Sequence, residues 1–170
     1  MFASCNILVK RFENSVISMI LTQILERGCI RAPLEGKDKK SVITELVDVL
    51  ADEGLLLDRD VVLDSVMVRE QTRSTGIGSG VAIPHGKSTG VKELVMSIGI
   101  AAEPLEFESI DGKGVTIVIL LASPLDKTGP HIQALARISR LMLDSEFKAK
   151  LESASSPEIV YDLISSKENE

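Results

Sequence analysis

Two apolar, β-rich runs constrain the fold of this 170-residue chain more than any other feature. The runs cover residues 93–102 (ELVMSIGIAA) and 115–123 (VTIVILLAS). Neither run alternates regularly between apolar and polar residues, and this pattern is typical of strands that are covered on both faces. We therefore expect both runs to be central strands of a sheet.

Helical patterns surround these strands. Asp58 is a good N-cap for one helix, and Gly54 ends the helix before it. A short helical turn over 20–27 and a short strand over 29–34 are expected near the start. Strands mixed with helices predict an α/β sandwich with helices on both faces of the sheet. The expected helices span residues 36–54, 58–73, 131–144, 145–153 and 156–166.

Composition excludes several classes of function. The chain has 19 basic and 25 acidic residues, a net charge of −6, and this balance argues against nucleic acid as the main partner. No apolar run is long enough to span a membrane. The two cysteines, Cys5 and Cys29, are too few for a metal site or a disulfide framework, so a reducing cytoplasm is expected. Residues 1–18 lack the pattern of a signal peptide. They are predicted to be an N-terminal extension, which is either loosely ordered or precedes a true start at Met19.

A glycine-rich run, STGIGSGVAIPHGKSTG (74–90), ends like a nucleotide-binding P-loop with Gly86, Lys87 and Ser88. A P-loop requires a further glycine five positions before Gly86, where this chain has Val81. Pro84 also lacks the N–H group that a phosphate cradle uses. The run therefore favours a buried strand that stops at Pro84 over a nucleotide site.

His85 directly follows that proline and lies among glycines at 76, 78, 80 and 86. Glycines let the backbone approach a ligand closely and leave N–H groups accessible. A histidine in this setting is a candidate nucleophile or general base. The alternative is a histidine held in a tight turn for structural reasons, and the local sequence favours neither.

His131 and Arg69 are two further candidates, each with a structural alternative. His131 follows Pro130 in the first turn of its helix, where the helix dipole favours a neutral ring and would also stabilise a phosphate. Considered alone, His131 fits a hydrogen-bonded histidine at the edge of the core better than a phosphate site. Arg69, near the end of its helix, either points its guanidinium at an anion or packs its stem and complements the helix dipole.

Two histidines, a glycine-rich turn and an arginine together favour phosphoryl transfer through a histidine. No cluster of carboxylates suggests a magnesium site, and no nucleotide motif is complete. This combination fits hydrolysis and metal chemistry less well.

The chain also resembles a known family, the fructose/mannitol-type enzyme IIA domain of the bacterial phosphotransferase system, which includes the nitrogen-regulatory enzymes IIA. The resemblance rests on REQTRSTGIGSGVAIPHGK (69–87), FESIDGK (107–113) and HIQALARISRLM (131–142). It covers about residues 19–166, and we expect the domain to span 19–167. It implies a three-layer sandwich, with a mixed sheet flanked by helices on both faces.

The resemblance further implies that His85 accepts a phosphoryl group from phospho-HPr and passes it to an enzyme IIB. His131 and Arg69 match the family's second histidine and its active-site arginine. A phosphoramidate donor makes a metal or other cofactor unnecessary. Brief docking requires an apolar surface around His85 with a modest charged rim. Backbone N–H groups are expected to line the phosphate site at Thr75, Gly76, Gly78, Ser79 and Gly80.

Three functions follow from this resemblance. The leading one is a cytoplasmic phosphoryl carrier in sugar uptake, of the fructose-like branch. The alternative is a nitrogen-regulatory phosphoprotein that controls partner proteins through phosphorylation of His85. A third, a domain that keeps the fold but only binds partners, is disfavoured because His85, His131 and Arg69 are all present.

Overall fold

The computed structural model describes residues 19–170, and the expected extension over 1–18 lies outside the described residues. Six strands and five α-helices follow a single turn of 3₁₀-helix, η1 (Leu21–Gln23). The strands are β1 (Leu25–Arg31), β2 (Gly76–Gly78), β3 (Val81–Ala82), β4 (His85–Lys87), β5 (Val95–Leu105) and β6 (Val115–Ser123). The helices are α2 (Lys39–Asp52), α3 (Arg59–Thr72), α4 (Thr128–Leu141), α5 (Ser145–Glu152) and α6 (Pro157–Glu168).

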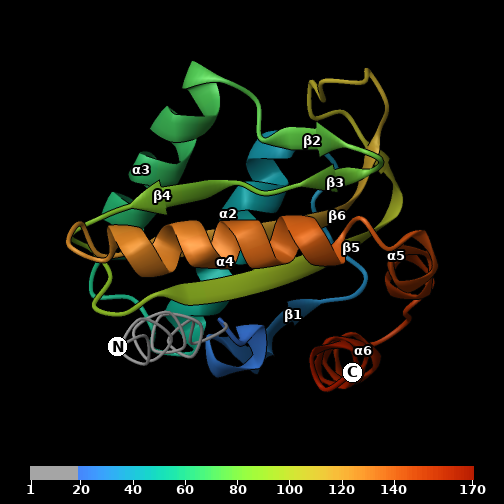
Figure 1. Ribbon diagram of the computed structural model, residues 1–170. Coiled ribbons are helices and arrows are strands. Elements are labelled where there is room, and N and C mark those ends of the chain that lie inside the picture. The colour runs from blue at the N-terminus through green and yellow to red at the C-terminus, as the bar shows by residue number, and fades with distance from the viewer. Residues whose placement is uncertain (1–18) are drawn as a thin grey trace, which may run out of the picture.

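The strands form one mixed sheet in the order β1-β5-β6-β3-β2. β4 also pairs with β6, further along that strand than β3 does. β5 and β6 are antiparallel, whereas β1 is parallel to β5, and both β3 and β4 are parallel to β6. Helix α4 crosses the front of the sheet, and α2 and α3 lie behind it (Figure 1). The expected three-layer α/β sandwich with a mixed sheet is therefore confirmed.

The two apolar runs are the centre of this sheet, as predicted. β6 occupies the predicted span 115–123, and every residue of it except Thr116 is buried. Seven consecutive residues of β5, from Val95 to Ala101, are also buried. A strand that is covered on both faces has no polar side to display, which explains the unbroken apolar sequence.

The start of the domain differs from the prediction. The helical turn expected over 20–27 is only the three residues of η1, and Gly28 lies inside β1 instead of ending a helix. The first strand therefore covers 25–31 and not 29–34. Cys29 and Ile30 are fully buried in it, so pairing with β5 outweighs the local helical pattern.

The prediction that a strand stops at Pro84 is wrong in one respect. β3 ends at Ala82, but the chain resumes pairing with β6 directly after the proline, as β4. Pro84 has no N–H to offer, yet its carbonyl oxygen accepts from the N–H of Leu121 at 3.1 Å. His85 is consequently the first residue of a paired strand, opposite Leu121, and does not lie in an unpaired turn.

Two helices position the other candidate residues. Asp58 caps α3, as predicted, by accepting from the N–H groups of Asp60 and Val61. Helix α4 begins at Thr128, three residues earlier than predicted, and ends at Leu141. His131 thus lies one turn inside the helix, where its side chain is buried against the sheet. Within residues 19–170, no helix is both long enough and apolar enough to cross a membrane.

Candidate functional site

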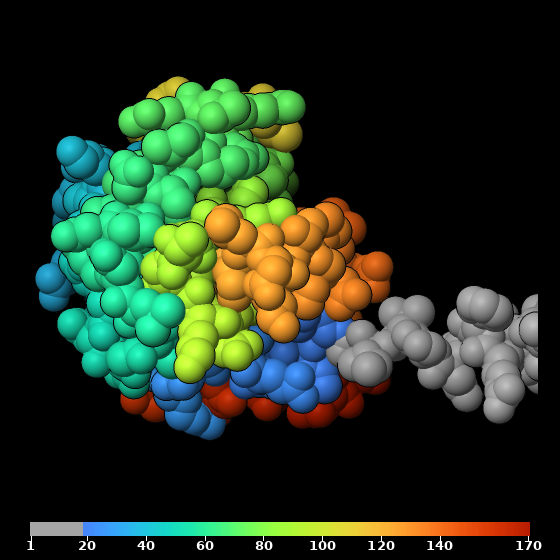
Figure 2. All heavy atoms as spheres, turned by 90° about the vertical axis from the view of Figure 1, so that its left-hand side faces the viewer, coloured from blue at the N-terminus to red at the C-terminus, as the bar shows by residue number. Residues whose placement is uncertain are grey.

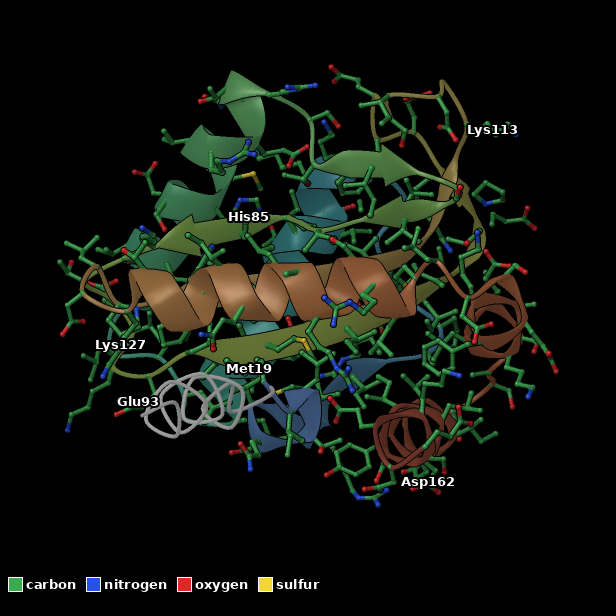
Figure 3. All side chains as sticks on the ribbon, viewed as in Figure 1. Met19, His85, Glu93, Lys113, Lys127 and Asp162 are labelled. Atoms are coloured by element: carbon green, nitrogen blue, oxygen red, sulfur yellow. The ribbon has the colours of Figure 1, made fainter. Side chains whose placement is uncertain are left out.

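His85 projects from β4 between α3 and α4 (Figure 3). Its ring is partly buried, and its Nδ1 atom lies 2.7 Å from the carbonyl oxygen of Ile83. Because a carbonyl oxygen only accepts hydrogen bonds, Nδ1 must carry the proton, and Nε2 keeps a free lone pair. Burial lowers the pKa of His85; the bond to Ile83 opposes this shift, and the positive charge of Arg69 adds to it.

His131 is the more deeply buried of the two histidines, with 4% of its surface exposed. Its Nδ1 atom lies 2.6 Å from the hydroxyl oxygen of Ser123, the last residue of β6. Burial, followed by the charges of His85 and Lys87, lowers the pKa of His131 to about 4. The ring is therefore neutral at pH 7, as the sequence predicts, although the structure gives burial as the first cause.

The two histidine rings face one another across the gap between β4 and α4. Their centroids are 5.5 Å apart, and their planes are inclined by 59°. Pairing of β4 with β6 sets this spacing, because His85 lies opposite Leu121 while Lys87 lies opposite Ser123, which holds His131. The structure thus brings together residues that are 46 positions apart in the chain.

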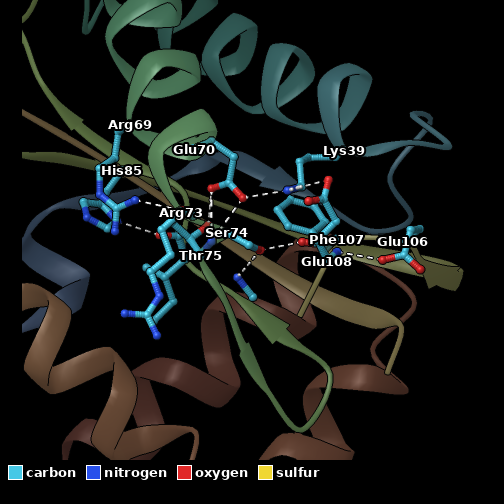
Figure 4. A network of polar contacts seen from close by, with 12 residues as sticks. Lys39, Arg69, Glu70, Arg73, Ser74, Thr75, His85, Glu106, Phe107 and Glu108 are labelled. Atoms are coloured by element: carbon cyan, nitrogen blue, oxygen red, sulfur yellow. Dashed lines mark hydrogen bonds and ion pairs between the residues drawn. The ribbon is translucent and has the colours of Figure 1, made fainter. Parts of the chain in front are cut away.

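Arg69 lies in the last turn of α3 and is partly buried. One of its guanidinium N–H groups donates to the carbonyl oxygen of Arg73 at 2.9 Å (Figure 4). Gly86 lets α3 approach β4 this closely, because a Cβ atom there would lie 2.9 Å from Ser65 Oγ and 3.1 Å from the backbone nitrogen of Val66. The glycine after His85 therefore serves the packing of the helix that carries Arg69.

A cavity of about 340 Å³ opens beside His85. The space-filling view from this side shows the yellow-green residues of β4 and the following loop between the green α3 and the orange α4 (Figure 2). Arg69 and His85 both line the cavity. The remaining lining residues come from the segment after α3, from Ile83 and Ile110, and from α4: Arg73, Ser74, Thr75, Gly76, Ile77, Ile83, Ile110, Leu135 and Ser139.

The surface around this cavity carries exposed apolar side chains, as expected for a docking face. Ile77 is 41% exposed and Ile110 is 69% exposed, and both line the cavity. Ile132 in α4 and Val68 in α3 are also exposed, although neither lines the cavity. Lys87 adds a charge, and its ammonium group donates to the hydroxyl of Thr128 at 2.8 Å.

The glycine-rich loop is split between two places. Thr75 and Gly76 line the cavity, whereas Gly78, Ser79 and Gly80 are absent from its lining. These three residues form the turn of the β2–β3 hairpin, with positive φ angles of 96°, 56° and 79°. The N–H of Ser79 donates to Asp111 at 2.9 Å.

The N–H groups of Thr75 and Gly76 are also engaged, by the carboxylate of Glu70 and by the hydroxyl of Ser74. Phosphate binding by the loop stays a prediction. For the N–H of Ser79 to bind a phosphate, its hydrogen bond to the carboxylate of Asp111 must first break.

Sequence reasoning missed Glu70 and Ser123. Glu70 follows Val62 and Val66 at intervals of four residues, so it continues their buried face, and only 4% of its side chain is exposed. That spacing is the signal in the sequence for a buried residue at position 70. Ser123 carries no comparable signal, because its role depends on a residue of another element.

Two curated proteins are similar to this chain over most of its length. It is 34% identical over 146 residues to the "PTS system fructose-specific EIIABC component" of Bacillus subtilis (strain 168); the alignment covers 86% of this chain but 23% of that protein. It is 31% identical over 158 residues to the "Nitrogen regulatory protein" of Escherichia coli (strain K12), covering 91% of this chain and 95% of that protein. The chain thus spans less than a quarter of the first relative.

Solved structures share the fold. The crystal structure of nitrogen regulatory protein IIA-Ntr from Neisseria meningitidis superposes with a TM-score of 0.79 at 31% identity, covering 86% of this chain and 99% of that one. A chain in the complex of enzyme IIA-mannitol with phosphorylated enzyme IIB-mannitol from Escherichia coli gives 0.71 at 19% identity, covering 84% and 99%. At 19% identity, the similarity to the mannitol complex shows only that the fold is shared.

Residues 23–167 match the family described as "Phosphoenolpyruvate-dependent sugar phosphotransferase system, EIIA 2". This match covers every strand of the sheet, and it includes His85, His131 and Arg69. The chain therefore belongs to the EIIA 2 family of phosphoryl carriers of the phosphoenolpyruvate-dependent sugar phosphotransferase system.

Proposed function

We propose that this protein is a phosphohistidine carrier, which accepts a phosphoryl group from phospho-HPr on Nε2 of His85 and transfers it to an enzyme IIB. The observation that carries this proposal is the 2.7 Å contact between His85 Nδ1 and the carbonyl oxygen of Ile83. That contact leaves the Nε2 lone pair as the nucleophile, beside a cavity that Arg69 also lines.

The transfer step balances without a proton passing between the two proteins. Nε2 of His85 forms a bond to phosphorus as the P–N bond of the donor breaks, and the electron pair of that bond returns to the donor ring. A donor ring protonated on its other nitrogen then leaves as neutral imidazole. The phosphorylated ring of His85 carries the positive charge, and its Nδ1–H remains bonded to Ile83, which stabilises the charged form.

Arg69 and His131 would stabilise the transferring group. The guanidinium of Arg69 neutralises the charge on the phosphoryl oxygens. For His131, the geometry favours the tautomer that donates from Nε2. Ser123 Oγ is buried, and its hydrogen-bond partner among the described residues is His131 Nδ1. A buried hydroxyl needs an acceptor for its proton, so Ser123 donates to Nδ1. The Nε2–H of His131 is then available to a phosphoryl oxygen or to His85.

The exposed apolar residues around the cavity support brief docking of protein partners at this face. A IIB acceptor is supported by the Escherichia coli IIA–IIB complex, whose IIA chain shares this fold. We place the protein in the cytoplasm, and we propose a domain over 19–167 that the family match over 23–167 supports.

A second candidate function is regulation. The similarity to nitrogen regulatory proteins, at 31% identity over 95% of the Escherichia coli protein and a TM-score of 0.79 to the Neisseria structure, favours it as the alternative. In that case His85 phosphorylation would control the binding of target proteins instead of supplying a IIB.

Labelling tests the proposal. The protein is mixed with phosphoenolpyruvate, enzyme I and HPr, and acid-labile phosphate is followed on the wild type and on His85→Ala. We expect label on the wild type alone; equal labelling of both would overturn the assignment of His85. Adding candidate IIB domains then separates the functions, because a carrier loses its label to a IIB and a regulator keeps it.

A further inference from the structure

Glu70 is a buried carboxylate that no part of the proposed transfer step uses. It ends the buried face of α3, and both of its oxygens accept hydrogen bonds from one residue, Thr75. The backbone N–H of Thr75 lies 3.1 Å and 3.3 Å from the two oxygens, and its hydroxyl lies 2.5 Å from Oε2. Hydrogen bonds donated to an ionised acceptor are about twice as strong as those between neutral groups, so Thr75 is firmly anchored.

Thr75 in turn holds the residue that orients His85. The carbonyl oxygen of Thr75 accepts from the N–H of Ile83 at 3.0 Å, and the carbonyl oxygen of Ile83 accepts from His85 Nδ1 at 2.7 Å. Three successive hydrogen bonds therefore connect the carboxylate of Glu70 to the ring of His85. Thr75 and Ile83 also line the cavity beside that ring.

Lys39 supplies the charge that makes a buried carboxylate tolerable. Its ammonium group lies 3.0 Å from Glu70 Oε1, and 22% of the Lys39 side chain is exposed (Figure 4). An ionised carboxylate that is buried without a partner costs several kcal/mol, and the ammonium group of Lys39 offsets this cost for Glu70. The second carboxylate near Lys39, Glu108, lies 3.7 Å from the same ammonium but is 80% exposed and makes no bond to Thr75.

We infer that Glu70, with Lys39 as its counter-charge, is a positioning residue for His85: by anchoring Thr75 it fixes Ile83, whose carbonyl oxygen holds the His85 ring with Nε2 free. The effect on transfer rests on the proposed function, whereas the effect on the ring does not. Loss of the anchor lets the segment from Thr75 to Ile83 shift, and misplacement of a reacting atom by about 1 Å can cost on the order of 100-fold in rate.

Two variants of the full chain remove the anchor to different degrees. In Glu70→Gln one carboxylate oxygen becomes an NH₂ group, which faces the donors of Lys39 and Thr75 instead of accepting from them. Thr75→Val removes only the hydroxyl, and Thr75→Ser retains it. Glu108→Gln is the matched control, because it removes a carboxylate near Lys39 without touching Thr75.

The primary readout is the tautomer of the unphosphorylated His85 ring, measured by ¹⁵N NMR on histidine-labelled protein at a temperature where each variant is folded. The wild type, Thr75→Ser and Glu108→Gln should show protonated Nδ1 and unprotonated Nε2. Glu70→Gln should shift both nitrogens toward a mixture of tautomers, and its labelling by phospho-HPr should slow roughly tenfold to 100-fold.

The outcomes separate the two claims. If Glu70→Gln is folded and keeps both the tautomer and the labelling rate of Glu108→Gln, Glu70 is not a positioning residue. If Glu70→Gln does not fold, Thr75→Val is compared with Thr75→Ser instead. An equal tautomer and an equal labelling rate in these two variants would likewise rule out the positioning role. If the wild type takes no label at all, the proposed function fails, and the tautomer measurement still decides the role of Glu70.

Discussion

The Nδ1 atom of His131 lies 2.6 Å from the hydroxyl oxygen of Ser123, and both residues are buried. This contact ties α4 to the end of β6 and places the second histidine ring 5.5 Å from that of His85. Because a buried imidazole without an anionic partner is more stable uncharged, burial favours the neutral form of both rings.

The first prediction concerns the titration of these rings. The ¹H NMR signals of His131 should titrate with a midpoint of about pH 4, and those of His85 should titrate below the ordinary histidine value of 6.5. The chain has two histidines, so the His131→Gln variant assigns the signals. A midpoint near 6.5 for His131 would mean that its ring is not buried in solution.

The second prediction follows from the same pKa shift. Unfolded His131 binds a proton near pH 6.5 and folded His131 only near pH 4, so the unfolded state binds more protons between these values. The contribution of the neutral His131 ring to the free energy of unfolding is therefore complete above about pH 6.5, and it is lost as the pH falls toward 4. The full shift corresponds to about 3 kcal/mol in the free energy of unfolding.

Urea unfolding at pH 7 and pH 4.5 measures this loss in the wild type and in His131→Gln. The wild type should lose more stability than the variant between the two pH values. Equal losses in both proteins would show that other groups, such as the carboxylates, account for the acid sensitivity.

The third prediction concerns Arg69. Arg69→Ala removes one recorded hydrogen bond, to the carbonyl oxygen of Arg73, and should cost only about 1 kcal/mol in stability. Labelling of His85 should slow by about 100-fold or more, since a preorganised cation beside the phosphoryl group is lost. Thermal unfolding and labelling rates test both parts.

Arg27→Ala is a suitable control, because Arg27 forms an exposed ion pair with Asp162 and lies outside the cavity. It should label like the wild type. A large loss of thermal stability with normal labelling in Arg69→Ala would instead make Arg69 a structural residue.

The fourth prediction tests the close packing of α3 on β4. In Gly86→Ala the new Cβ atom would lie 2.9 Å from Ser65 Oγ and 3.1 Å from the nitrogen of Val66, so α3 must move away. Overpacking of this kind costs about 1–3 kcal/mol, and the displaced helix carries Arg69 with it. Denaturant unfolding measures the cost. Gly129→Ala, where a Cβ atom meets nothing within 4 Å, should change stability little; an equal effect of both substitutions would contradict the packing argument.

The sequence predicted the parts of the fold that depend on burial and local capping. β6 has the predicted bounds because a strand buried on both faces leaves an unbroken apolar run. Asp58 caps α3 as predicted, since the cap depends only on the next few residues. Within the site, the candidates His85 and Arg69 do line one cavity, and His131 lies beside it.

What the sequence could not predict depends on contacts between distant segments. Gly28 looks like a helix terminator, but pairing of β1 with β5 places it in a strand. Pro84 interrupts local pairing, yet β4 resumes because β6 continues alongside it. Glu70 became visible as an anchor only when the fold brought Thr75 and Lys39 to it.

The chemical position of the phosphoryl group tests the central claim most directly. The protein, labelled with ¹⁵N in its histidines, is phosphorylated by phospho-HPr, and NMR identifies the ring nitrogen bonded to phosphorus. The hydrogen bond from Nδ1 to Ile83 predicts phosphorylation at Nε2 of His85, with Nδ1 still protonated. Phosphorus on Nδ1 of His85, or on any other residue, would contradict the account.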